Sequence, residues 1–149
     1  MKLMVAVGLV GAVAFCSSMA AQGEGPRRDG NWQVTVEMDM PGMPQRMPPM
    51  TVTQCVTKAD AADPTRTIPQ GQGPGAMPDT CKTTNVKTVG DKVSWSMQCA
   101  GQNPFTGDAE FVYSRDTYTG TMKMNMDRGG QPVVMAMKYN GKRLGDCER

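Results

Sequence analysis

The chain has 149 residues, with 16 Lys and Arg against 14 Asp and Glu, so its formal net charge is +2. No basic block stands out, and proteins that bind nucleic acid or anionic membranes normally carry one. Histidine is absent while methionine reaches 15 residues. The commonest general acid–base side chain is therefore missing, and soft thioether sulfur is abundant.

Residues 1–20 are predicted to be an export signal. A positive start is followed by an apolar segment too short to span a bilayer, and then by small residues. Cleavage after Ala20 and cleavage after Ala21 fit equally well. We therefore expect a periplasmic or secreted protein, with no later segment apolar enough to cross a membrane.

Five cysteines occur in the chain. Phe15 is too large to precede a lipidated cysteine, so Cys16 is expected to leave with the signal. An even number of cysteines in an exported chain predicts disulfides. Those that remain are Cys55, Cys81, Cys99 and Cys147. The sequence has no CxxC pair and no histidine, which argues against a zinc site.

After the signal we predict a flexible leader at 21–30 and a single β domain at 31–149. Apolar and polar residues alternate from Trp32 to Met40, which is typical of a half-buried strand. Prolines then predict a long loop at 41–49, because proline cannot donate to a strand ladder. The segment "MTVTQCVT" predicts the second strand.

A short helical turn is predicted after the second strand. Thr57 is placed to cap "KADAAD", with Asp60 three positions on, and Pro64 ends the turn. This turn opens a second long loop at 58–80. The glycine-rich part of that loop lacks the strand, helix and lysine that a phosphate-binding loop needs.

Two tight turns set the register of the later strands. The two-residue turn in "RGGQ" places Met124 opposite Met135. The turn in "SRDT" places Phe111 opposite Gly120, so that Gly120 lies beside aromatic rings, which stabilise strand glycines.

Two further turns extend this pattern. Asn140 and Gly141 form a type I′ signal, which predicts a hairpin with Leu144 opposite Met137. The segment "VGDK" predicts a turn that brings the preceding strand back to Val86.

The turns agree on one buried face. It comprises Ala109, Phe111, Tyr113, Tyr118, Met122, Met124, Met126, Val133, Met135, Met137, Tyr139 and Leu144, and is extended by Val93, Trp95 and Met97. Polar residues occupy the other face. The predicted fold is all-β: an antiparallel up-and-down meander of about eight strands, forming a strongly curved, disulfide-stabilised sheet or a small barrel.

Strand parity favours one pairing of the cysteines. Cys81 and Cys99 flank the hairpin at 86–97 and can meet across its open end with a one-residue bulge. Cys55 and Cys147 both lie on the polar face. We therefore expect the bonds Cys81–Cys99 and Cys55–Cys147, the second of which ties the carboxyl end to the second strand.

The buried methionines have a plain interpretation as core, because methionine fills irregular space. The sharper hypothesis is an interior that repacks around an apolar ligand. The candidate ligand-binding residues are Trp32, Trp95, Phe111, Tyr113, Tyr118, Met122, Met124, Met126, Met135, Met137 and Tyr139.

The methionines in and around the proline-rich loop form a second candidate set. Thioethers are soft ligands that suit Cu(I), so an alternative is a copper site made by Met38, Met40, Met43, Met47 and Met50. The loop is also a candidate for binding a partner protein.

No catalytic residues and no resident cofactor are predicted. The chain offers no histidine, its cysteines are expected in disulfides, and no carboxylate pair lies in an apolar setting. The expected function is that of an exported, non-enzymatic β-protein that binds an apolar ligand or an envelope component.

Several segments together resemble a known family. They are "GNW", "MPGMPQRMPP", "TQC", "VSWSMQC", "YTGTM" and "GKRLGDC", and they span residues 30–147. They resemble bacterial exported proteins described as domain of unknown function 3617. The resemblance implies a compact, strand-rich protein of the periplasm or the exterior, and it supplies no activity and no catalytic residues.

Overall fold

The structure is a computed structural model, and it describes residues 25–42, 47–69 and 77–148. The predicted signal peptide lies outside these residues. The elements are β1 (Gly30–Asp39), β2 (Met50–Val56), α1 (Lys58–Ala62), the 3₁₀ helix η1 (Pro64–Thr67), β3 (Cys81–Val89), β4 (Lys92–Cys99), β5 (Phe105–Ser114), β6 (Thr117–Arg128) and β7 (Gln131–Gly145). None of the described helices is long and apolar enough to span a membrane.

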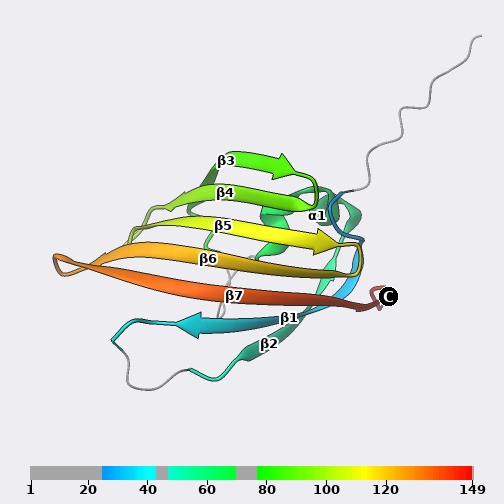
Figure 1. Cartoon of the computed structure of the whole chain (residues 1–149), viewed down its shortest axis with the longest axis horizontal. Helices are drawn as coiled ribbons and strands as arrows, with labels where there is room; N and C mark the ends of the chain where they lie inside the picture. Colours follow the sequence, from blue (N-terminus) through cyan, green and yellow to red (C-terminus); the bar gives the residue numbers. More distant parts are fainter. Residues whose placement is uncertain (1–24, 43–46, 70–76, 149) are drawn as a thin grey trace, which may run out of the picture.

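All seven strands belong to one antiparallel sheet with the order β2-β1-β7-β6-β5-β4-β3 (Figure 1). Consecutive hairpins link β3 to β7, as expected for a meander. The β1–β2 hairpin joins the sheet through β1, which pairs with β7. Within the described residues β2 and β3 are the two edges, so the sheet is open rather than closed into a barrel.

The described residues form seven strands and not the predicted eight, because the chain does not turn at Asn140 and Gly141. Asn140 pairs with Thr35 of β1 and Thr119 of β6, and β7 continues to Gly145. A type I′ turn needs positive φ at both central residues, and neither Asn140 nor Gly141 has it. Neighbours on both sides satisfy the backbone of this segment and hold it extended.

The same correction applies to Leu144, which was expected to lie opposite Met137. Met137 instead pairs with Met122 of β6 and with Met38 of β1. Leu144 lies near the end of β7 and is 52 % exposed. The prediction was wrong because it assumed a hairpin at Asn140 and Gly141, where β7 continues as one extended strand.

The other predicted turns are correct. Met124 pairs with Met135, and Phe111 pairs with Gly120. The "VGDK" turn pairs Val89 with Lys92, and Val86 lies on the preceding strand as predicted, with a side chain that is 51 % exposed. A bulge between Thr84 and Lys87 shifts the register there.

Both disulfides have the predicted pairing, Cys55–Cys147 and Cys81–Cys99. Cys81 lies directly opposite Cys99, and the bulge in β3 is the one-residue bulge that this pairing requires. The first bond connects β2 to the chain just after β7.

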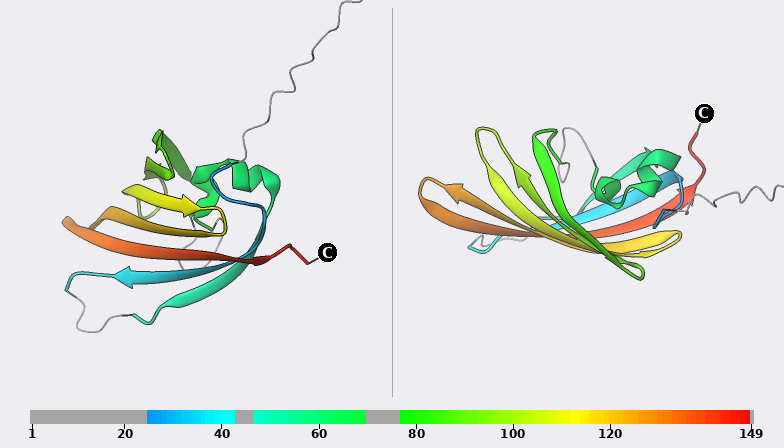
Figure 2. Two further views of the ribbon diagram at one scale, coloured as in Figure 1. Left: turned by 45° about the vertical axis from the view of Figure 1, so that its right-hand side comes forward. Right: turned by 90° about the horizontal axis from the view of Figure 1, so that it is seen from above.

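The short helix is also as predicted. The Thr57 side chain accepts a hydrogen bond from the Asp60 backbone N–H, and the Asp60 carboxylate accepts one from the Thr57 backbone N–H, which completes a capping box. The Asp63 side chain then caps η1, which begins at Pro64. This helical segment lies over one face of the sheet (Figure 2).

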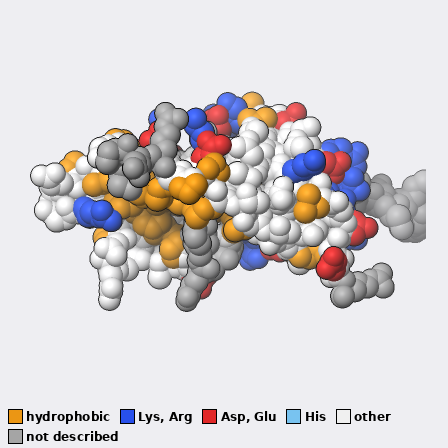
Figure 3. Space-filling view, turned by 90° about the horizontal axis from the view of Figure 1, so that it is seen from below, with side chains coloured by type: hydrophobic (Ala, Val, Ile, Leu, Met, Phe, Trp, Pro, Cys, Tyr) orange, Lys and Arg blue, Asp and Glu red, His pale blue; other side chains and the backbone are white. Residues whose placement is uncertain are grey.

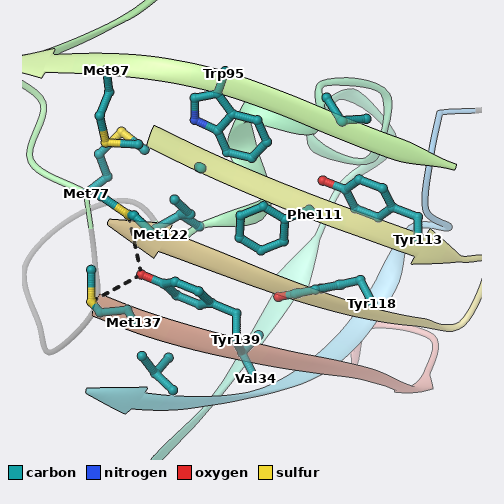
Figure 4. Close-up of a cluster of buried hydrophobic side chains, with 14 of the residues drawn as sticks. Val34, Met77, Trp95, Met97, Phe111, Tyr113, Tyr118, Met122, Met137 and Tyr139 are labelled. Atoms are coloured by element: carbon teal, nitrogen blue, oxygen red, sulfur yellow. Dashed lines mark hydrogen bonds between the residues drawn. The ribbon is translucent and has the colours of Figure 1, made fainter. Parts of the chain in front are cut away.

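Aromatic side chains form the half of the core beneath α1 and η1. Trp32, Trp95, Phe111, Tyr113 and Tyr118 are at most 3 % exposed. Their rings contact one another in stacked, tilted or edge-to-face pairs at centroid distances of 5.2 to 6.3 Å. Figure 4 shows four of them: Trp95, Phe111, Tyr113 and Tyr118.

The described end of the predicted flexible leader packs against this cluster. Arg27 is only 3 % exposed. Its guanidinium carbon lies 5.9 Å from the ring centroids of both Trp32 and Tyr118, and its Nη2 donates to the Arg66 carbonyl at 2.8 Å. Burial is the main cause that lowers the pKa of Arg27 from its ordinary value.

Candidate functional site

The other half of the same face holds an apolar pocket of about 250 Å³. Ten described residues line it: Met38, Ile68, Met77, Pro78, Phe105, Met122, Met124, Met135, Met137 and Tyr139. Figure 3 shows hydrophobic side chains collected in a hollow on one side of the molecule. Six of the ten are methionines, so thioether groups dominate the lining.

Strand register brings these methionines together. Met124 and Met135 form one cross-strand pair and Met122 and Met137 form the next, two positions along β6 and β7. Because side chains two residues apart share a face, all four point to the same side of the sheet. Met38 extends the row onto β1, where it pairs with Met137.

Tyr139 lies at the boundary between the aromatic half and the methionine half. Its ring centroid is 5.5 Å from that of Phe111. Its hydroxyl lies 3.5 Å from Met137 Sδ and 3.8 Å from Met122 Sδ (Figure 4). Burial raises the pKa of the Tyr139 hydroxyl well above its ordinary value, so the group is a neutral donor at physiological pH.

Five of the eleven predicted ligand-binding residues line the pocket. They are Met122, Met124, Met135, Met137 and Tyr139. Trp32, Trp95, Phe111, Tyr113 and Tyr118 lie in the aromatic cluster instead, where their rings pack on one another. Met126 is half-buried near the end of β6 and pairs with Phe105 and Val133.

Sequence reasoning missed the other side of the pocket. Phe105 begins a run of alternate apolar positions that leads to Phe111, so strand parity alone could have placed it on the inner face. Ile68 and Met77 stand out as apolar residues within the polar loop predicted at 58–80, and each precedes a proline. That loop therefore contributes to the core at both of these positions.

Four of the five predicted copper ligands lie in the described part of the chain. Met38 lines the pocket, whereas Met50 begins β2 and pairs with Val36. Met40 and Met47 are half-buried near the proline loop. Met43 lies outside the described residues.

The aromatic half contains polar groups with unusual surroundings. Tyr113 Oη and Thr67 Oγ1 lie 2.5 Å apart, and burial raises the pKa of Tyr113 to about 12. Tyr118 Oη is buried without a hydrogen-bond partner in the described part of the chain. Burial also raises the pKa of Tyr118. The Tyr113 hydroxyl also donates to the Pro64 carbonyl oxygen at 3.3 Å, and neither Tyr113 nor Tyr118 is among the residues that line the methionine pocket.

The outer face of the sheet has a polar hollow of about 350 Å³ over β3 to β6. Both carboxylates in its lining have a partner. Ser96 donates to Asp108 at 2.8 Å, and Lys92 pairs with Glu110 at 2.9 Å. This surface is typical of a solvated sheet face, so the methionine pocket is the stronger candidate site.

Together the fold and the pocket define a disulfide-linked, all-β domain with an apolar recess on the inner face of an open sheet. The family model described as "Protein of unknown function (DUF3617)" matches residues 27–147. The chain belongs to this family, as its sequence segments had indicated. No curated protein and no solved structure matches the chain.

Proposed function

We propose that this domain is a non-enzymatic protein that binds a small apolar molecule in the methionine pocket. The observation that carries the proposal is the lining. Nine of the ten described lining residues have side chains made only of hydrocarbon or thioether groups, and the tenth is Tyr139. Removing such an apolar surface from water lowers the free energy of the system, which favours the binding of an apolar ligand.

The size and softness of the pocket support a small ligand. A dry apolar cavity of ~150 Å³ is enough to take up benzene, so about 250 Å³ has room for a substituted ring or a short hydrocarbon chain. Methionine side chains are unbranched and polarizable, and they can adapt to guests of different shape. We therefore propose that the pocket accepts ligands of different shapes, provided that they are apolar.

The same lining supports binding over catalysis. General acid–base and nucleophilic catalysis need groups that exchange protons or attack carbon near neutral pH. The described lining offers thioethers, hydrocarbons and one hydroxyl with a raised pKa. The four described cysteines are in disulfides.

The two disulfides also support the proposed location outside the cytoplasm. Such bonds form and persist in the periplasm and the exterior, where the environment is oxidising. An export signal at residues 1–20 would deliver the chain there. The proposed ligand is then a molecule of the cell envelope or its surroundings.

Methionine methyl NMR tests this function directly, because six lining residues carry the probe group. Titration with toluene should shift the methyl signals of Met124, Met135 and Met137. The variant Met135→Gln places an amide in the pocket and should weaken toluene binding roughly tenfold. The matched variant Val134→Gln changes the neighbouring exposed residue and should leave the affinity unchanged.

Absence of any toluene-dependent shift in the pocket methyls would refute the proposal. Native mass spectrometry of the protein isolated from its own cells gives an independent check. A small apolar molecule that co-purifies supports the function. A protein partner crosslinked through the loop at 41–49 would favour the partner-binding alternative.

A second candidate function is the binding of a soft monovalent ion, Cu(I). Six thioethers around one pocket favour it, because thioether sulfur is a ligand that Cu(I) prefers. Met38 belongs to this pocket and to the predicted loop set with Met40, Met43, Met47 and Met50. The pocket and the loop are thus two possible locations for one ion.

Silver(I), a redox-stable substitute for Cu(I), separates these locations. If the pocket holds the ion, the Met122→Leu/Met137→Leu double variant loses silver binding and retains toluene binding, because leucine keeps the apolar bulk and removes the sulfur. If the loop holds it, the Met43→Leu/Met47→Leu/Met50→Leu variant loses silver binding. A parent protein that takes up no silver contradicts both sites.

A further inference from the structure

The described lining of the methionine pocket is apolar except for one polar side chain, that of Tyr139. Among its ten described lining residues, Tyr139 alone has an oxygen or nitrogen atom in its side chain. The hydroxyl is directed toward Met122 and Met137, which themselves line the pocket (Figure 4). A molecule in the pocket therefore meets one strong hydrogen-bonding group among the described side chains.

The present partners of this hydroxyl are weak. Thioether sulfur is a poor acceptor, and the two sulfurs lie at 3.5 and 3.8 Å from the oxygen. A hydroxyl has a single hydrogen, so it can satisfy only one of them at a time. A carbonyl oxygen is a much better acceptor and would replace the sulfur without loss.

We propose that the natural ligand is an apolar molecule with one neutral carbonyl acceptor, such as a ketone or an ester, and that Tyr139 selects it by donating a hydrogen bond to that oxygen. This inference rests on the proposed function and names the ligand class. The hydrocarbon part lies against the methionines, and the carbonyl faces the hydroxyl. Tyr139 is thus a specificity-determining residue.

A charged acceptor fits this surface less well. Moving a carboxylate from water into an apolar site is costly unless a cation or several donors meet it. None of the described lining residues is a cation. Arg27 lies in the aromatic half, against Trp32 and Tyr118.

The substitution Tyr139→Phe isolates the hydroxyl. Phenylalanine keeps the ring that packs on Phe111 and that lies beside Gly120, so the fold should be retained. The matched control is Tyr118→Phe. It removes a hydroxyl that is equally buried but outside the pocket and without a partner among the described residues.

The probes are acetophenone and α-methylstyrene, which have nearly the same shape and differ in a carbonyl oxygen against a methylene group. Their affinities for the parent and for both variants are measured by methionine methyl NMR. Tyr139→Phe should weaken acetophenone binding roughly tenfold and change α-methylstyrene binding less than about twofold. Tyr118→Phe should leave both affinities unchanged.

Two results would overturn the inference in different ways. If both probes bind and Tyr139→Phe affects them equally, Tyr139 does not select a carbonyl, although the pocket still binds apolar molecules. If neither probe binds the parent, the inference fails, and the proposed function fails with it only if toluene does not bind either.

Discussion

Two strand glycines, Gly120 and Gly141, each lie beneath an aromatic ring of the neighbouring strand. A Cβ atom at Gly120 would be 2.3 Å from Phe111 Cδ1, and one at Gly141 would be 2.1 Å from Tyr118 Cε1. Both distances are too short for any side chain. The rings use the space that the absent side chains leave, which closes the aromatic half of the core.

The substitution Gly141→Ala should therefore destabilise the domain by about 3 kcal/mol or more, because the added methyl group must displace the Tyr118 ring from a packed site. The measurement is urea unfolding followed by tryptophan fluorescence. The exposed neighbour Asn140 gives the control, since Asn140→Ala should change the free energy of unfolding by less than about 0.5 kcal/mol. Equal losses in the two variants would contradict this role for Gly141.

Gly141 also shows where local sequence signals mislead. Asn-Gly is a strong hairpin signal, yet here the glycine leaves space for the Tyr118 ring on the adjacent strand. Gly120 was placed correctly because the turn at 115–116 fixed its opposite residue. For Gly141 the deciding contact comes from a residue 23 positions earlier, Tyr118, and the dipeptide itself carries no sign of it.

Among the described elements, β7 is the longest strand, and it lies between two others in the sheet. It runs from Gln131 to Gly145 and pairs with β1 on one side and β6 on the other. Each backbone N–H in its central part can reach a neighbouring strand. The element is therefore rigid at the place where a turn had been predicted.

Hydrogen exchange can check this continuity. The amides of Asn140 and Gly141 should exchange as slowly as that of Lys138, because all three lie between paired strands. The amides of Gly129 and Gly130, which form a true turn, should exchange rapidly. Rapid exchange of the Asn140 and Gly141 amides would contradict a continuous β7 and would favour the hairpin predicted from the sequence.

Sequence reasoning performed best where one tight turn determines many pairs. The turns in "SRDT" and "RGGQ" gave the register of β5, β6 and β7, and parity then gave the inward methionines and the disulfide partners. The pairing of β1 with β7 joins Val36 to Tyr139, and no local pattern encodes a contact over that separation. The division of the inner face into an aromatic half beneath α1 and η1 and a methionine half depends on where these two helices lie, which strand parity cannot reveal.

At the scale of the whole molecule, the two disulfides differ in the length of chain that they close. The bond Cys55–Cys147 spans 92 positions, whereas Cys81–Cys99 spans 18. By loop entropy the first should stabilise the domain by about 4–5 kcal/mol and the second by about 3 kcal/mol. The longer bond also connects the β1–β2 hairpin to the end of β7.

Replacement of both cysteines of one bond by alanine should reveal this difference. Cys55→Ala/Cys147→Ala should lower the free energy of unfolding more than Cys81→Ala/Cys99→Ala does. Urea unfolding of the two double variants without reductant measures both losses. A larger loss for the shorter bond would mean that local packing at the β3–β4 hairpin outweighs loop entropy.

Alkaline pH should destabilise the whole domain through its buried tyrosines. Burial raises the pKa of Tyr113 from its ordinary value of 10.0 to about 12, and the pKa values of Tyr118 and Tyr139 are raised as well. Below pH 10 these groups are neutral in the folded and the unfolded chain, so their contribution is constant. Above pH 10 the unfolded chain loses protons that the folded chain retains, and stability falls.

The expected fall for Tyr113 lies between pH 10 and about 12 and approaches roughly 1.4 kcal/mol per pH unit for each such tyrosine. Urea unfolding at a series of pH values measures it. The variant Tyr113→Phe should show a shallower fall, because one titrating group is removed. Stability that stays constant from pH 9 to 12 would show that these hydroxyls ionise as easily in the folded chain as in the unfolded one.

The place of β1 between β2 and β7 determines when folding can finish. β1 is made early on the ribosome, and its inward residues Trp32 and Val34 belong to the buried core. One of its two neighbours, β7, is made last. A nascent chain can form the β1–β2 hairpin, but it cannot assemble the complete sheet until synthesis has passed residue 145. Until then the inward residues of β1 lack one of the two strands that flank them in the sheet, and exposed apolar surface of this kind is prone to aggregate.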